Sequence, residues 1–190
     1  MKQALIVIDM LNDFFDKNAS LSRQRKKLCA NINDLARFAR KNGLPIIWVK
    51  QEFKPDLSDA FLIMRKKNIS ITIKGTPGSD FVRELNRKKK DFVIIKKRYS
   101  AFFRTNIDKL LHKLRIDTLI ITGINSHACI RTAAIDAYQR DLNVIIAKDC
   151  VASYDRKHHE ISLNYLQKSM GIQILSNDEI ISLKLNCIQK

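Results

Sequence analysis

Five short apolar runs, separated by segments with helical periodicity, restrict the folds open to this chain more than any other feature. Each run is rich in β-branched residues and continuously apolar, whereas a strand with one solvated face would alternate apolar and polar residues. The runs therefore predict strands that are covered on both faces. They lie at residues 4–8, 45–49, 92–95, 118–122 and 144–147.

Between the runs, apolar residues recur at the three-to-four spacing of a helix. The clearest case lies within 28–39, and Gly43 followed by Pro45 predicts the end of that helix. Strands that alternate with helices predict right-handed crossovers. We expect an α/β protein with one domain over residues 1–190: a three-layer α/β/α fold around a doubly wound, mostly parallel, Rossmann-like sheet of about six strands. Further helix starts are predicted at Thr105 with Asp108, at Asp155, and at Ser176 with Glu179.

Composition excludes several classes of protein. A chain of 190 residues that is 45% hydrophobic, with few Pro and Gly, is globular rather than disordered or fibrous. Its apolar runs are far shorter than the ~20 residues of a membrane span, and no signal peptide precedes the first run, so we expect a cytoplasmic protein without a membrane partner. The cysteines are scattered and form no C-x-x-C pair, which favours reduced thiols; they are Cys29, Cys129, Cys150 and Cys187.

The formal charge of +16 is the unusual feature of the composition. Such a field can attract nucleic acid or anionic substrates. The basic clusters at 23–27, 64–67 and 86–90 nevertheless lack interleaved aromatic residues and match no nucleic-acid module. We therefore interpret them as a solvated basic surface and do not expect nucleic acid as a partner.

The predicted fold brings reactive side chains to one edge of the sheet. Ligands of open α/β sheets bind outside the carboxyl ends of the strands. Asp9 follows the first predicted strand, Lys96 the third, and the segment from Gly123 to Cys129 the fourth. A carboxylate, an amine and a thiol can therefore converge there.

Cys129 lies where the fourth strand gives way to a predicted helix from about 128 to 139, with Ser126 as a plausible N-cap. The positive end of the helix dipole and a nearby lysine would stabilise a thiolate, and the first amides of the helix could bind an oxyanion. Asp9 could accept the thiol proton and return it to a leaving amine. A buried packing role for Cys129, and capping or ion-pair roles for Asp9 and Lys96, stay open at this point.

Three motifs together resemble the isochorismatase-like cysteine hydrolase superfamily. They are "ALIVIDMLNDFF" at 4–15, "KKRYSAFFRTNID" at 96–108 and "TGINSHACIRTAAIDAYQRD" at 122–141. The resemblance implies a catalytic triad of Asp9, Lys96 and Cys129. It also implies a cis peptide between Ile124 and Asn125 that turns the amides of Asn125 and Cys129 toward an oxyanion.

The same resemblance bears on cofactors and assembly. Nicotinamidases of this superfamily hold a metal with an Asp-x-His cluster after the second strand, but no histidine occurs between Trp48 and Gly78. We therefore disfavour a nicotinamidase and predict no metal and no cofactor. Relatives commonly form dimers or tetramers, so we expect a homo-oligomer. The segment from Lys50 to Gly78 could serve as a lid or a subunit contact.

Several residues are candidates for binding a small-molecule substrate. Arg98 and Tyr99 could bind its carboxylate or ring, and Phe14 and Trp48 could line the site, although core packing of Trp48 is an equal alternative. His127 neighbours the nucleophile, but support or packing is the better interpretation than base catalysis. The other histidines, His112, His158 and His159, read as ordinary helix residues.

Three functions remain in competition. The leading hypothesis is a cysteine hydrolase that cleaves a C–N bond of a small amide, lactam or ureido compound through a thioester. The second is an isochorismatase-type vinyl-ether hydrolase, although such enzymes commonly lack the cysteine. The third is a catalytically idle basic domain that binds nucleic acid or a protein partner. The sequence does not identify the substrate.

Overall fold

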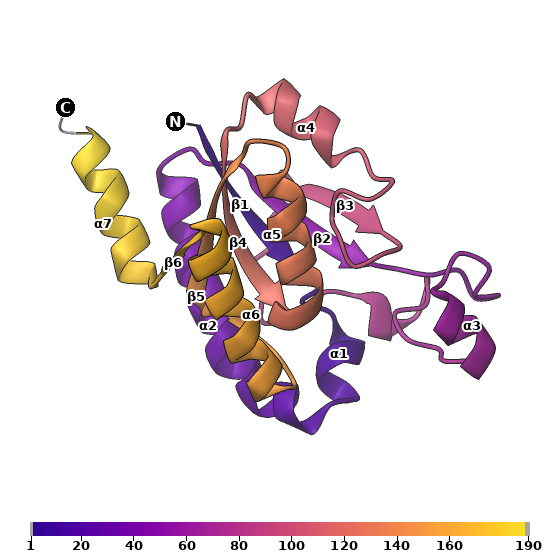
Figure 1. The fold of residues 1–190 in the computed structure, drawn as a ribbon. Helices are drawn as coiled ribbons and strands as arrows, with labels where there is room; N and C mark the ends of the chain where they lie inside the picture. Colours follow the sequence, from indigo (N-terminus) through magenta and orange to yellow (C-terminus); the bar gives the residue numbers. More distant parts are fainter. Residues whose placement is uncertain (1, 189–190) are drawn as a thin grey trace.

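The computed structural model describes residues 2–188, with side chains through Leu183, and its centre is a single parallel sheet (Figure 1). The strand order is β3-β2-β1-β4-β5-β6. The first strand therefore lies in the middle of the sheet, and the chain adds strands first on one side of it and then on the other. In register, Ile6 of β1 lies between Ile47 of β2 and Ile121 of β4. The strands are β1 (Gln3–Ile8), β2 (Ile46–Gln51), β3 (Phe92–Lys96), β4 (Thr118–Ile124), β5 (Asn143–Ala152) and β6 (Gln173–Leu175).

Helices cover both faces of the sheet. One face is packed by α4 (Ile107–Leu114), α5 (Arg131–Tyr138) and α6 (Arg156–Met170), and the other by α2 (Ala19–Lys41) and α7 (Asn177–Ile188). The remaining helical segments are α1 (Asn12–Asp16), α3 (Leu62–Lys67), a 3-10 turn η1 (Pro77–Ser79) and a π-helical turn η2 (Ser126–Ile130). This arrangement confirms the predicted α/β class and the doubly wound sheet.

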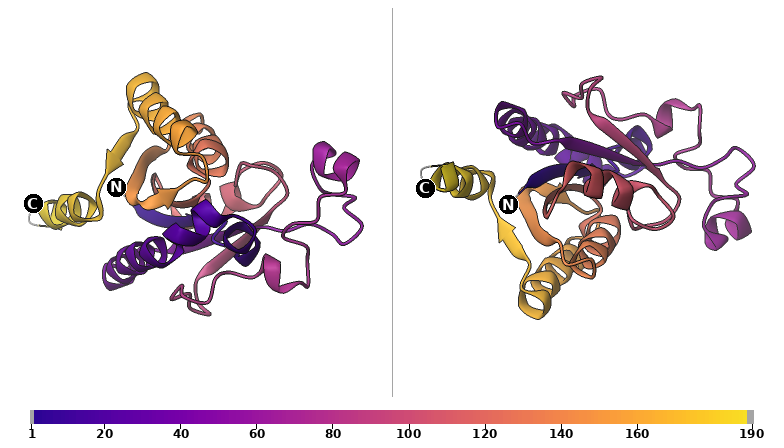
Figure 2. Two further views of the ribbon diagram at one scale, coloured as in Figure 1. Left: turned by 90° about the horizontal axis from the view of Figure 1, so that it is seen from below. Right: turned by 90° about the horizontal axis from the view of Figure 1, so that it is seen from above.

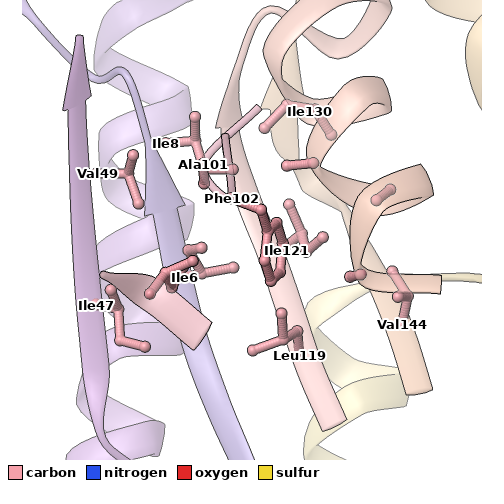
Figure 3. Packing of buried hydrophobic residues seen from close by; sticks show 14 of the residues in the cluster. Ile6, Ile8, Ile47, Val49, Ala101, Phe102, Leu119, Ile121, Ile130 and Val144 are labelled. Atoms are coloured by element: carbon pink, nitrogen blue, oxygen red, sulfur yellow. The ribbon is translucent and has the colours of Figure 1, made fainter. Parts of the chain in front are cut away.

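The core is divided by the sheet because successive side chains of a strand point to opposite faces. In β1, Ile6 and Ile8 belong to the cluster under α4, α5 and α6, whereas Leu5 and Val7 belong to the cluster under α2. Figure 3 shows the first cluster, in which side chains from the central strands point toward Phe102 and Ile130. Both clusters are almost fully buried, which explains why the inner strands read as continuous apolar runs. The prediction of two covered faces is wrong for β3: it is an edge strand, and its Phe92, Val93 and Ile95 are exposed.

Most predicted element boundaries agree with the structure. Asp155 caps α6 through a bond from the amide of His158 to its Oδ1 (2.9 Å), and Ser176 and Glu179 bond reciprocally at the start of α7. The box predicted at Thr105 does not form. Asn106 precedes α4 instead, and the Asp108 carboxylate is 2.8 Å from Arg140.

The chain between β2 and η1, residues 52–76, forms an excursion with α3 that extends away from the sheet (Figures 1 and 2). It has a small apolar core of its own, which includes Phe53, Leu57 and Met64. Backbone bonds between Phe53 and both Thr72 and Lys74 close its base. Separately, no helix within residues 2–188 is long and apolar enough to cross a membrane.

Candidate active site

The predicted acid, amine and thiol meet at the carboxyl edge of the sheet. Asp9 directly follows β1, Lys96 is the last residue of β3, and Cys129 lies in η2, just after β4. The Lys96 Nζ atom is 2.6 Å from Oδ2 of Asp9 and 3.3 Å from Sγ of Cys129. A single ammonium group therefore contacts both the carboxylate and the sulfur.

Asp9 is held by the neighbouring strand β2. Its backbone is left-handed, with φ of 55°, and its amide donates to the carbonyl of Val49 (2.9 Å). Its Oδ1 accepts a 2.8 Å bond from the amide of Gln51. Oδ2 contacts Lys96 as an ion pair without a well-aligned hydrogen bond, and it has no hydrogen-bond partner among the described residues. That oxygen therefore keeps a lone pair that can take a proton.

Lys96 is fully buried and carries its charge there. Its Nζ also donates to the carbonyl of Arg98 (3.1 Å), so three acceptor groups surround it. Burial lowers the pKa of Lys96, but its interactions with the Asp9 carboxylate and with the Cys129 sulfur outweigh burial and raise that pKa above its ordinary value. The amine is an ammonium ion at neutral pH.

The thiol of Cys129 differs from the sequence expectation of a stabilised thiolate. Only 5% of the residue is exposed. Burial and the Asp9 carboxylate raise the pKa of Cys129 to about 12, and the opposing effect of Lys96 is smaller. The resting sulfur is therefore a thiol, because desolvation and the Asp9 carboxylate act more strongly than the lysine. A nucleophilic role for Cys129 requires a base, and Asp9 is adjacent.

The turn that carries Cys129 has an uncommon backbone. The peptide bond between Ile124 and Asn125 is cis, as the resemblance implies. The amides of Ala128 and Ile130 both donate to the carbonyl of Asn125, at 3.0 and 3.2 Å, within the π-helical turn η2. The helical segment thus begins at residue 126 rather than 128.

The prediction that Ser126 caps this helix is wrong. Asn125 precedes the turn, and neither it nor Ser126 makes a side-chain cap. The Ser126 hydroxyl is instead 2.7 Å from Nδ1 of His159 in α6, and Nδ1 of His127 is 2.6 Å from the hydroxyl of Ser153. Sequence reasoning missed His159 and Ser153, since residues about thirty positions apart carry no local signal of contact.

Two candidate substrate residues, Arg98 and Tyr99, hold the excursion in place. The Arg98 guanidinium donates to the carbonyl of Asp59 (2.8 Å) and lies over the ring of Phe61, which stacks at 4.7 Å on Tyr99. The neighbouring Lys97 pairs with the Asp59 carboxylate at 2.9 Å and donates to the carbonyl of Glu52. The loop after Lys96 is therefore fastened to residues 52–61.

The other two candidates, Trp48 and Phe14, pack on the α2 side of the sheet, whereas Cys129 belongs to the cluster on the opposite side. Trp48 is fully buried, and its indole nitrogen donates 3.0 Å to Asp91, which precedes β3 at the amino edge. Trp48 therefore has the packing role that the sequence left open. Phe14 is half-buried against the same cluster, and this placement gives no support to a contact with substrate.

The segment after β2 does not suit a metal ion. Glu52 is paired with Lys50 at 2.7 Å, and Phe53 is buried in the core of the excursion. Within the described part of the chain, no cluster of three or more His, Cys, Asp or Glu side chains could hold a metal. The absence of a metal stays a prediction.

Comparison with known proteins extends over nearly the whole chain. An isochorismatase family protein of Bacillus subtilis (strain 168), YaaI, named as uncharacterized, is 31% identical over 180 residues, covering 94% of this chain and 96% of that protein. A protein of Arabidopsis thaliana named as a probable inactive nicotinamidase is 32% identical over 177 residues, covering 90% of each.

Solved structures show the same fold. An isochorismatase family protein from Desulfovibrio vulgaris superposes with a TM-score of 0.85 at 27% identity, covering 97% of this chain and 98% of that one. An N-carbamoylsarcosine amidase from Thermoplasma acidophilum superposes with a TM-score of 0.79 at 27% identity, covering 94% and 98%. The family model described as the isochorismatase domain matches residues 3–178, and the chain therefore belongs to the isochorismatase family.

Proposed function

We propose that this protein is a cysteine hydrolase that cleaves a C–N bond in a small amide, lactam or ureido compound. The observation that carries the proposal is the position of the Lys96 ammonium, 2.6 Å from the Asp9 carboxylate and 3.3 Å from the Cys129 sulfur. Similarity to an N-carbamoylsarcosine amidase supports the reaction class. Retention of Cys129 favours this route over vinyl-ether hydrolysis, which needs no thiol.

In the first step, the Cys129 sulfur attacks the carbonyl carbon of the substrate and its proton passes to Oδ2 of Asp9. The raised pKa of the thiol makes this transfer part of the attack, because little thiolate exists beforehand. The oxyanion that forms is received by the amides of Asn125 and Cys129. Asp9 then gives the proton to the leaving nitrogen as the C–N bond breaks, which leaves a thioester on Cys129.

In the second step, a water molecule attacks the thioester while Asp9 accepts one of its protons. The C–S bond breaks, the acid leaves, and the proton on Asp9 returns to the sulfur. Lys96 keeps its charge throughout and offsets the negative charge that moves between Asp9 and Cys129. Its full burial suits this role, since charge interactions are stronger where water is excluded.

A panel of small amides tests the proposal by ammonia or amine release. The intact mass of the protein, measured in parallel, should reveal an acyl adduct. We expect turnover with at least one amide, and we expect Cys129→Ala to reduce it by more than about 1,000-fold, because the covalent route is lost.

Cys150→Ala is the matched control, since Cys150 is also buried with its thiol pKa raised to about 12 but lies in β5 and bonds to Asn177. It should retain activity. Turnover that survives Cys129→Ala, or an adduct on another residue, would disprove the mechanism.

A further inference from the structure

Three consecutive residues at the start of the Cys129 turn are bonded to one segment, residues 153–159, which comprises the connection after β5 and the first residues of α6. The Oδ1 atom of Asn125 accepts a 3.3 Å bond from the amide of Tyr154. The Ser126 hydroxyl is 2.7 Å from Nδ1 of His159, and Nδ1 of His127 is 2.6 Å from the Ser153 hydroxyl. The turn is thus held from outside as well as by its own backbone.

These side chains add to the backbone bonds of the turn, which converge on one residue. Two of its amides share one acceptor, the carbonyl of Asn125. Ser126 is fully buried, so its hydroxyl has no water to replace a lost partner. The structure gives His159 as the partner of that hydroxyl. Removal of the imidazole would leave the buried Ser126 hydroxyl without its partner. The hydroxyl could then rotate, and the turn could shift.

The imidazoles of His127 and His159 are neutral rings that each bond to a serine hydroxyl through Nδ1. Burial lowers the pKa of both; Asp155 opposes this for His127 and Glu160 for His159. His158 also lies near His127, but its own Nδ1 is bound to Asp155 at 2.7 Å. The Ser153 hydroxyl oxygen accepts a 3.0 Å bond from the amide of Asp155 and is also bonded to the His127 ring. The tautomer of each ring sets which partner donates.

We propose that His159 is a positioning residue of the active site: through its bond to the Ser126 hydroxyl, it fixes the turn that presents the Asn125 amide and the Cys129 sulfur to a reacting carbonyl. The bond between His127 and Ser153, the residue after β5, supports the same turn. The inference deepens the proposed function and rests on it for the identity of the reacting groups. It assigns to α6 a part in the chemistry that its sequence does not suggest.

Two reagents distinguish a change in the position of the turn from a change in the exposure of the Cys129 sulfur. Acylation of Cys129 by p-nitrophenyl acetate passes through an oxyanion and depends on the amides of the turn, whereas alkylation by iodoacetamide forms no oxyanion. We expect His159→Leu and Ser126→Ala to slow acylation of the full-length protein by about 10- to 100-fold. Alkylation should change by less than about threefold.

His159→Asn is the conservative variant, because an asparagine amide places a polar atom where Nδ1 of histidine lies. It should restore acylation to within about threefold of the natural protein. His112→Leu is the matched control, since His112 is an exposed residue of α4, and it should change neither rate. The inference would be overturned if His159→Leu slowed acylation and alkylation equally, or if His159→Asn did not restore the rate of acylation.

The outcome also separates this inference from the proposed function. If no amide is hydrolysed but p-nitrophenyl acetate still acylates Cys129, C–N cleavage is wrong and the variants still decide the role of His159. If the natural protein is acylated no faster than Cys129→Ala, the turn does not bind an oxyanion and both proposals are wrong.

Discussion

At the level of single residues, the site depends on a close approach between β4 and β1. Gly123 has φ of +111°, and a Cβ atom built on it would lie 2.0 Å from the carbonyl oxygen of Ile8. The residue after Ile8 is Asp9, so any side chain at 123 would push on the backbone that carries the carboxylate. Only glycine combines this backbone angle with this separation.

We expect Gly123→Ala to prevent folding or to lower the free energy of unfolding by more than about 3 kcal/mol, since strain and a backbone clash add. Gly43→Ala is the control: Gly43 has φ of +66° but open space around its Cα, so the cost should be about 1 kcal/mol. Urea denaturation measures both. Similar losses in the two variants would show that the close approach has no energetic importance.

At the level of elements, hydrophobic pattern sufficed to locate β1 to β5 and most helix boundaries, because these depend on local burial and capping. The start of α5 did not follow this pattern. Its first turn is π-helical and held by His159, a contact between residues 33 positions apart. The short strand β6 has only three residues, too few for a period to be recognised. The sequence therefore predicts the sheet better than the turn that carries the nucleophile.

The excursion at 52–76 is attached to the site by polar contacts that can open. Asp59 is the central residue: its carboxylate pairs with Lys97, accepts a 2.9 Å bond from the amide of Lys54, and its carbonyl accepts from Arg98. The small core of the excursion is separate from the two clusters of the sheet. Local opening of this segment can therefore occur without unfolding of the sheet.

We expect Asp59→Ala to increase hydrogen exchange of amides within 52–76 by about fivefold, because a partly exposed ion pair and its bond are worth about 1 kcal/mol. The midpoint of thermal unfolding should change little. Asp56→Ala is the matched control, since Asp56 is exposed in the same loop and bonds only to Ser58 nearby. Unchanged exchange in Asp59→Ala, or an equal increase in Asp56→Ala, would show that the contact to Lys97 does not hold the excursion.

At the level of the whole molecule, the sequence predicts which residues meet but not their protonation. The order of strands places Asp9, Lys96 and Cys129 at one edge, and the structure brings them into contact. The pKa of the thiol depends instead on how completely the rest of the fold removes water from it. That quantity is a sum over side chains from many elements, and no motif records it.

Burial acts in the same way on the other described cysteines. It raises the pKa of Cys29, Cys129 and Cys150 to about 12 in the folded protein, from an ordinary value of 9.0. Cys187 lies outside the described side chains. Between pH 9 and 12 the unfolded chain loses protons that the folded protein retains, so the free energy of unfolding falls as pH rises. Below this window the three thiols contribute their full stabilisation.

The alkaline decrease in stability should therefore depend on the number of buried thiols. Each contributes a slope of up to about 1.4 kcal/mol per pH unit, so the double variant Cys29→Ala, Cys150→Ala should lose up to about 2.8 kcal/mol per pH unit of that slope. Urea denaturation at several pH values from 8 to 11 measures this slope.

The slopes of the free energy of unfolding against pH are compared rather than its absolute values, because alanine leaves small cavities that lower stability at every pH. Lysine and tyrosine residues also titrate in this pH range, but they are the same in the natural protein and the double variant. Their contribution therefore cancels in the difference between the two slopes. If the free energy of unfolding fell equally steeply with pH in the natural protein and the double variant, these thiols would ionise in the folded protein as they do in the unfolded chain. Burial at Cys129 would then offer no reason for Asp9 to act as the base.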